Sequence, residues 1–374
     1  MRAFVAVFGV VVILVILWDA FEALVLPRRV TRRLRPTRFF YTTTWRLWKL
    51  GARPLRLGGR RETYLSYYAP LSLLLLLNLW AFALVAGFAM LQWWSLGLAV
   101  KTEGARPTIL DALYMSGSTF FTLGLGDIVP TTGLSRTLTV VEAGVGFMFL
   151  AIMVGYLPVL NQAFSRREVS IVLLDARAGS PPTAAELLRR HADETAALVT
   201  LLREWERWAA DVLESHLSYP VLSYFRSQHD NQSWLAALTT ILDASALITV
   251  TMRGDVERQA HLTFAMARHA VVDLAQVLRR PPHLDPPDRL PPEHALRLLA
   301  ECGAVSAAHG EMVLEQLAQL RVMYEPYVVP LADHLLMPLP AWMGEAGRDN
   351  WRTSAWERRM IGRVAPARDV HADD

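Results

Sequence analysis

Cysteine is almost absent from this chain of 374 residues, which contains only Cys302. A single cysteine excludes a disulfide within the chain and a metal site built from several thiolates. The sequence also lacks a His-Glu-x-x-His pattern and a glycine-rich phosphate loop, and His261 and His269 are spaced as ordinary helix-surface residues. We therefore expect no enzymatic activity, no catalytic residues and no cofactor.

Charged residues are missing from long stretches of the first half. Phe4 to Trp18 and residues 63–100 hold none, and the apolar run over 138–164 holds only Glu142. About 20 helical residues cross the hydrocarbon core of a bilayer. The pattern predicts an all-α membrane protein with transmembrane helices over 1–26, within 64–100 and over 136–163. The second run is too long for one upright helix, so that helix must tilt, project beyond the bilayer or end early.

Acidic residues are absent from residues 27–61, where twelve arginines and lysines occur. Loops this basic stay in the cytoplasm, so we expect the N-terminus outside and the C-terminal region inside. Aromatic residues interleave with the basic ones, which is typical of an interfacial segment on anionic lipid rather than of a nucleic-acid site. A cleaved signal peptide over 1–26 is the competing interpretation, but it would require translocation of the basic loop.

The stretch "FTLGLGDIVP", residues 121–130, lies between the second and third apolar runs. Residues 109–121 are too short for a span and suit a half-helix entering from outside, with Asp111 in its first turn after Thr108. Irregular backbone within a membrane is tolerated only where protein buries it or where it lines a water-filled path. Alternating glycines let successive carbonyls face one way, as ligands for a dehydrated cation. One such stretch per chain predicts a symmetric homo-oligomer.

"TFFTLGLGD", residues 119–127, resembles the potassium-channel filter signature T-x-x-T-x-G-[YF]-G-D, and the likeness extends over residues 64–163. The chain is similar to bacterial potassium channels of the two-transmembrane type, with an extra N-terminal span. The resemblance implies passive transport through a homotetramer in the inner (plasma) membrane, with permeant K⁺ ions. It implies that the filter ligands are carbonyls of Thr122, Leu123, Gly124 and Leu125 and the Thr122 hydroxyl. Gly126 and Asp127 would support the outer mouth.

Two filter residues depart from that family. Leu125 stands where the family usually has Tyr or Phe, whose ring holds the opening at a fixed width, and Phe121 replaces a small residue and is a candidate for packing behind the filter. Tyr114 and Met115 fall where many relatives carry two tryptophans. The alternative function is a membrane-anchored helical signalling or scaffold protein with a non-conducting or non-selective pore.

Polar and small residues within the predicted spans have candidate roles. Gly144, Gly146 and Gly155 on the inner helix indicate either a gating hinge or close helix packing. Glu142 is predicted to line the cavity or to brace the filter from behind. Polar residues elsewhere in the spans predict partners: Asp19 and Glu22 with arginines such as Arg28 or Arg29, and Asn78 with another helix.

Residues 164–374 are predicted to form a cytoplasmic helical regulatory domain. Thr183 followed by Glu186 marks a helix start, and six prolines in 279–292 mark a loop. The apolar spacing predicts helices over about 184–216, 231–252, 254–279, 293–318 and 320–336. The segment "IVLLDA", residues 171–176, suits either a strand or a continuation of the inner helix.

Overall fold

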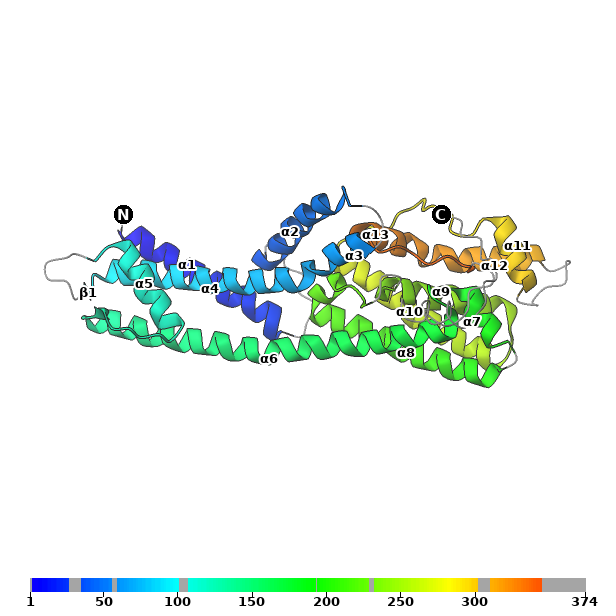
Figure 1. Ribbon diagram of the computed structural model, residues 1–374, viewed down its shortest axis with the longest axis horizontal. Helices are drawn as coiled ribbons and strands as arrows, with labels where there is room; N and C mark the ends of the chain where they lie inside the picture. The colour runs from blue at the N-terminus through cyan, green and yellow to red at the C-terminus, as the bar shows by residue number, and fades with distance from the viewer. Residues whose placement is uncertain are drawn as a thin grey trace, which may run out of the picture. The chain divides into compact units, whose positions relative to one another are not determined.

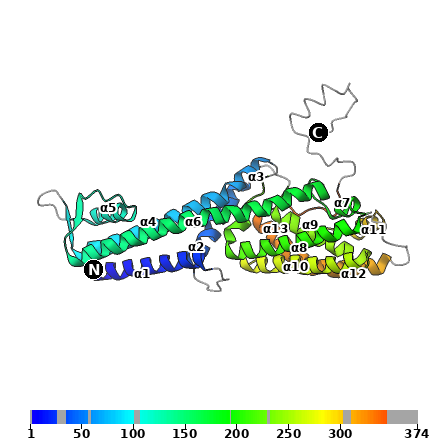
Figure 2. The same cartoon turned by 90° about the horizontal axis from the view of Figure 1, so that it is seen from below.

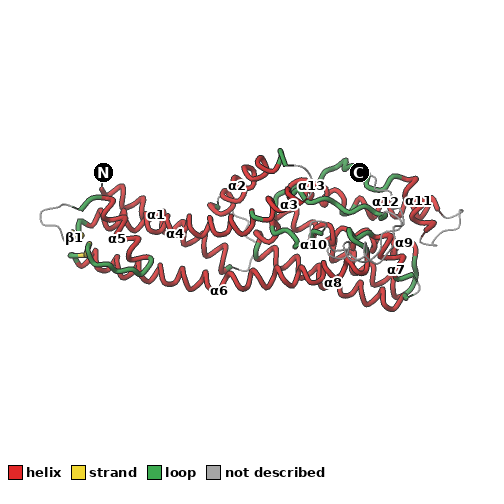
Figure 3. The backbone as a smooth tube through the Cα atoms, viewed as in Figure 1, coloured by secondary structure: helices red, strands yellow, loops and turns green. Residues whose placement is uncertain are grey.

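The computed structural model describes residues 2–26, 35–55, 59–100, 107–192, 194–228, 232–301 and 310–344. This part of the chain is almost entirely helical (Figure 3), as the sequence predicts. Its contacts divide the chain into two units. Unit 1 comprises Met1–Arg166 and Glu214–Arg226, and unit 2 comprises Arg167–Leu213 and Ser227–Asp374. Cys302 lies outside the described residues.

Unit 1 is built on two long helices that run side by side, α1 (Arg2–Ala20) and α4 (Tyr68–Ser95) (Figures 1 and 2). A π-helical turn, Phe21–Val25, continues α1. The two helices are in close contact at these glycines: a Cβ on Gly9 would lie only 2.8 Å from the Gly87 carbonyl oxygen. Small residues permit this approach in membrane helices. Within the described part of one chain, Asn78 donates to the Leu74 carbonyl of its own helix and not, as predicted, to another helix.

Within the second apolar run, residues 63–100, the helix ends at Ser95, before the end of the run. Leu96 adopts a left-handed conformation with φ of 54°, which stops α4 at Ser95. A short strand follows, β1 (Leu98–Val100), and pairs antiparallel with β2 (Ile128–Pro130). The helix thus ends early, but its 28 residues still span about 42 Å, more than the roughly 30 Å of the hydrocarbon core, so tilt or projection beyond the bilayer stays a prediction.

The basic segment contains helices where the sequence indicated a loop: α2 (Pro36–Ala52) and α3 (Gly59–Ser66). The carboxylate of Asp19 accepts hydrogen bonds from Thr37 N at 3.0 Å and from Trp80 Nε1 at 3.1 Å. A carboxylate is favourable at this helix N-terminus. Arg35 Nε lies 3.2 Å from Glu22, so an arginine does meet the acidic pair, whereas Arg28 and Arg29 lie outside the described residues.

The inner helix is longer than predicted. Helix α6 (Gly133–Ala178) continues through "IVLLDA", which is therefore helical. The following elements are α7 (Ala184–Arg190), α8 (Thr195–Ser218), the 3₁₀ turn η2 (Pro220–Tyr224), α9 (Trp234–Thr251), α10 (Asp255–Val277), α11 (Pro292–Glu301), α12 (Gly310–Val322) and α13 (Glu325–Leu335). The helix predicted over 184–216 is interrupted after Arg190.

Four helices in the described part of the chain are long and apolar enough to cross a membrane, one more than predicted. The fourth is α9, but 89% of its most apolar window is buried by protein. It packs against α7, α10, α12 and α13. A helix that is apolar all round and covered by other helices is the core of a bundle, so we assign α9 to the core of unit 2.

Candidate functional site

The candidate site begins with a short helix, α5 (Ile109–Phe120), whose start is fixed by a capping box. Thr108 Oγ1 accepts from Asp111 N at 3.3 Å, and Asp111 accepts from Thr108 N at 2.7 Å. The bond from Thr108 N, and a second from Thr108 Oγ1 to the same carboxylate at 2.7 Å, lower the pKa of Asp111. The predicted half-helix and its capping residue therefore lie where the sequence indicated.

The backbone after α5 adopts a left-handed conformation at every second residue. Thr122, Gly124 and Gly126 have φ values of 57°, 60° and 73°, and Leu123 and Leu125 between them do not share this left-handed conformation. Glycine adopts a positive φ without steric cost, but a threonine does so rarely. A chain that alternates in this way turns successive carbonyls toward one side.

The last turn of α5 holds the start of this segment. Leu123 N donates to the Ser118 carbonyl at 2.7 Å, and Thr122 N donates to the Thr119 carbonyl at 3.0 Å. Ser118 Oγ accepts from Leu125 N at 3.5 Å. The carbonyl end of a helix carries partial negative charge, so the segment starts at an end that favours a cation.

The side chains of the segment lack cover within one chain. Leu123 is 64% exposed, Leu125 is 62% exposed and Phe121 is 53% exposed. Phe121 touches the ring of Phe120 at a centroid distance of 5.3 Å, and Phe120 is buried. Large apolar residues exposed together indicate a surface that other protein or lipid covers.

Asp127 closes the segment. Its carboxylate accepts from Ile128 N at 3.1 Å and forms a hydrogen bond with the Tyr114 hydroxyl that raises the pKa of that tyrosine. Tyr114 thus links α5 to the end of the predicted filter. Met115, the next residue, is buried in a small core with Ala89, Leu98, Ala112 and Ile128.

Glu142 of α6 lies behind α5 and is fully buried. It accepts a hydrogen bond from Ser116, and the Ser116 hydroxyl also lies 2.7 Å from the Val85 carbonyl oxygen of α4. The three residues tie α4, α5 and α6 together. Within one chain the carboxylate contacts protein rather than open space, and its role as a brace for the filter stays a prediction.

The three glycines of the inner helix have different surroundings. A Cβ on Gly146 would lie 2.2 Å from the Phe120 carbonyl oxygen, so α6 approaches the end of α5 only because this residue is glycine. Gly144 and Gly155 have open space at the Cβ position. Close packing therefore accounts for Gly146, while Gly144 and Gly155 remain candidates for a hinge.

A second polar tie was not predicted from the sequence. Gln92 of α4 is fully buried, donates to Thr139 Oγ1 at 3.0 Å and accepts from Ser135 Oγ at 2.8 Å. These bonds join the end of α4 to the start of α6. The available signal was Gln92 itself, one of two amides in a charge-free helix, and the sequence pattern does not indicate its partner.

Comparison with known proteins agrees with this geometry. The model of the ion channel family matches residues 74–161, which contain most of α4, all of α5, the segment 122–127 and α6 as far as residue 161. An uncharacterized membrane protein of Bacillus subtilis (strain 168), YdjJ, is 24% identical over 261 residues, which are 69% of this chain and 74% of that protein. No solved structure matches the chain. The resemblance of this region to an ion-channel pore domain is thereby confirmed, and the comparison supports an ion channel in a membrane.

Proposed function

We propose that four copies of this chain form a passive potassium channel whose filter is lined by backbone carbonyls. The observation that carries the proposal is the alternation of left-handed φ at Thr122, Gly124 and Gly126 directly after α5. Carbonyls turned to one side can replace the hydration shell of a monovalent cation. The proposed ligands are the carbonyls of residues 122–125 and the Thr122 hydroxyl.

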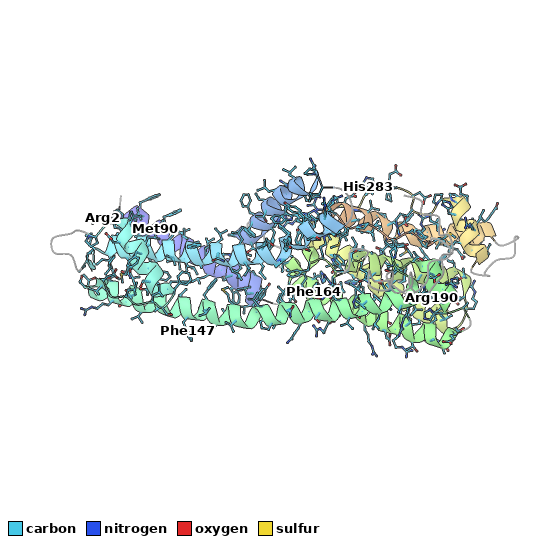
Figure 4. All side chains as sticks on the ribbon, in the orientation of Figure 1. Arg2, Met90, Phe147, Phe164, Arg190 and His283 are labelled. Atoms are coloured by element: carbon cyan, nitrogen blue, oxygen red, sulfur yellow. The ribbon has the colours of Figure 1, made fainter. Side chains whose placement is uncertain are left out.

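The same segment supports assembly from several copies, and the number four is taken from the resemblance to potassium channels. One chain offers one wall of a site, and Leu123 and Leu125 are largely exposed in it. A ring of ligands requires several copies around an axis, and a closed symmetric homo-oligomer supplies them. On the inner helix, Phe147 is 67% exposed and projects outward from α6 (Figure 4), which leaves apolar surface for neighbouring chains or lipid.

We also propose an orientation and a lipid contact. The acid-free segment 27–61 faces the cytoplasm, the N-terminus lies outside the inner membrane, and residues 164–374 act as a cytoplasmic regulatory domain. On α2, exposed Phe39, Leu47 and Leu50 each follow a basic residue in the sequence, namely Arg38, Arg46 and Lys49. Apolar rings and side chains next to basic residues suit an interface that carries anionic lipid.

Rubidium uptake into liposomes tests the function. Purified protein is reconstituted, and uptake of rubidium is compared with that of sodium for the unaltered chain and for Gly124→Asp. We expect rubidium uptake that Gly124→Asp abolishes, because a side chain at φ of 60° is strained and adds a charge among the ligands. If the unaltered protein and Gly124→Asp take up rubidium equally, the channel function is contradicted and the scaffold alternative is favoured. If the unaltered protein takes up sodium as well as rubidium, a non-selective pore is favoured.

The assembly and orientation need separate measurements. Light scattering of the detergent-solubilised protein gives its mass, and four copies correspond to four times 42.0 kDa. Cleavage of an N-terminal tag by protease added outside intact spheroplasts, with a C-terminal tag protected, checks the orientation. A monomer, or protection of the N-terminal tag, contradicts the corresponding part of the proposal.

A further inference from the structure

A segment distant in sequence from the predicted pore belongs to unit 1. Residues 219–226, called here the return segment, belong to unit 1 with the rest of Glu214–Arg226, whereas residues 167–213 and 227–374 belong to unit 2. The chain therefore leaves unit 1 along α6, comes back in α8 at Glu214, and leaves again after Arg226. The sequence predicted no division of this kind.

The return segment contacts the inner helix at two aromatic pairs. Tyr219 meets Tyr156 edge to face with ring centroids 5.5 Å apart, and Phe225 meets Phe164 at 5.5 Å. Phe164 lies more than two helical turns beyond Tyr156 on α6. Val221 and Leu222, between these rings, are buried in the core that also contains Leu160 and Ala163. The C-terminal part of the predicted inner helix, from Tyr156 to Phe164 of α6, is therefore in contact with this segment.

The return segment also contacts α2 and α3 of the basic segment and the N-terminal end of α4. The Tyr224 ring lies 5.1 Å from the Trp45 ring of α2 and 5.3 Å from the Tyr68 ring of α4. Arg226, buried, forms an ion pair with Glu62 of α3 at 3.4 Å. Eight residues thus contact α2, α3, α4 and α6, all within unit 1.

We propose that the return segment is a positioning element for the inner helix α6. Through this segment, the C-terminal helices set the conformation of α6 and thereby whether the channel is open. The proposal rests on the proposed channel function. Its basis is covalent: α8 carries the chain from unit 2 directly into Tyr219, so a displacement of α8 moves the residues that touch Tyr156 and Phe164. A displacement of unit 2 can also reach the inner helix directly, because α6 itself continues into unit 2. The return segment is a second connection from unit 2 to the same helix.

Variants of the two rings test this role in the full-length protein in liposomes. Tyr219→Leu and Phe225→Leu each remove one ring contact with α6. Ring pairs of this kind shift an equilibrium by roughly twofold to tenfold. We expect both variants to change the open probability in single-channel recordings by that factor and in the same direction, with the rubidium-to-sodium ratio unchanged. Tyr219→Phe keeps the ring and is expected to behave like the unaltered protein.

Two comparisons separate gating from a general loss of stability. Tyr156→Leu combined with Tyr219→Leu should have no larger effect than either alone, because the two rings form one contact. Trp48→Leu is the matched control: its ring packs on Tyr64 and Tyr68 in the same aromatic region of unit 1, and it should leave open probability unchanged.

The outcomes distinguish this proposal from the function on which it rests. If the unaltered protein conducts but both ring variants keep its open probability, or if Trp48→Leu changes it equally, the return segment has only a packing role and the proposal is overturned. If the unaltered protein takes up no rubidium, the channel function itself fails. A variant that elutes as an aggregate is replaced by Tyr219→Met or Phe225→Met, which keep more of the buried volume.

Discussion

Ser116 on α5 donates a hydrogen bond to Glu142 on α6, and both side chains are fully buried. Because Ser116 also lies 2.7 Å from the Val85 carbonyl, the pair joins the helix before the predicted filter to both neighbouring helices. The second carboxylate oxygen of Glu142 has no partner in the described part of the chain. Glu142 therefore helps to hold α5 against α4 and α6 within one chain.

Replacement of Glu142 is expected to loosen this brace. Glu142→Ala removes the acceptor and leaves a void, which together cost about 2–4 kcal/mol. Glu142→Gln keeps the shape and a hydrogen-bonding oxygen and should lose much less. Thermal unfolding followed by tryptophan fluorescence, with rubidium uptake in liposomes, measures both effects. Equal midpoints for Glu142→Ala and the unaltered protein would show that the brace is unimportant.

Gly146 and Gly144 allow a matched test of helix approach. Gly146→Ala places a methyl group against the backbone oxygen of Phe120, and overpacking of this kind costs about 1–3 kcal/mol or more. Gly144→Ala, on the same helix with open space at its Cβ, should be tolerated and gains up to about 1 kcal/mol in helix propensity. Expression yield and the thermal midpoint are the measurements. A Gly146→Ala protein as stable as Gly144→Ala contradicts the close approach of α6 to α5.

Leu125 is the position where we expect a substitution to change selectivity. Its side chain is 62% exposed in one chain and has no hydroxyl with which to anchor the segment. Leu125→Tyr adds a ring and a hydrogen-bonding group that can hold the opening at a fixed width. We expect a higher ratio of rubidium to sodium uptake for Leu125→Tyr and no such change for Leu125→Met, which conserves volume. An unchanged ratio in Leu125→Tyr removes the argument that this residue sets the width.

Short-range patterns in the sequence predicted the parts of the site that depend on neighbours along the chain. Thr108 and Asp111 fixed the start of α5, and the two glycines indicated alternating backbone. The partner of Glu142 was not predicted, because Ser116 is brought beside it only by packing of α5 against α6. Gly146 shows the same limit, since glycines at hinges and at close contacts look alike in sequence.

The return segment and the core helix of unit 2 show why the rest could not be predicted. Residues 220–224 contain no periodic pattern, and their place beside α6 depends on contacts more than fifty residues apart in sequence. The apolar composition of α9 fits a membrane span and a buried core equally, and the surrounding helices decide between them. Composition does not encode which neighbours a helix will have.

Arg289 in unit 2 allows a test of the buried charges around α9. Arg289 Nη2 lies 2.7 Å from Asp243 Oδ2, and Nη1 lies 3.3 Å from Glu325 Oε1. Burial by itself lowers the pKa of Arg289, but the adjacent carboxylate of Asp243 raises it above its ordinary value, so the guanidinium stays charged. Tyr324 also donates a hydrogen bond to Asp243. Removing one member of a buried ion pair leaves the other charge uncompensated, which costs about 3–5 kcal/mol.

Arg289→Met is therefore expected to raise amide hydrogen exchange in α9 and α13 strongly. Adding Asp243→Asn to this variant removes the unpaired charge and should restore part of the protection. Arg258→Met breaks an ion pair with Asp255 whose side chains are 77% and 83% exposed, and exposed pairs contribute little. Exchange resolved by peptide is the suitable measurement, because it reports the local stability of α9 and α13 separately from the rest of the chain. If amide exchange in α9 and α13 is the same in Arg289→Met and Arg258→Met, loss of the buried ion pair has no more effect than loss of an exposed one. The buried pair then does not hold α9 to the neighbouring elements.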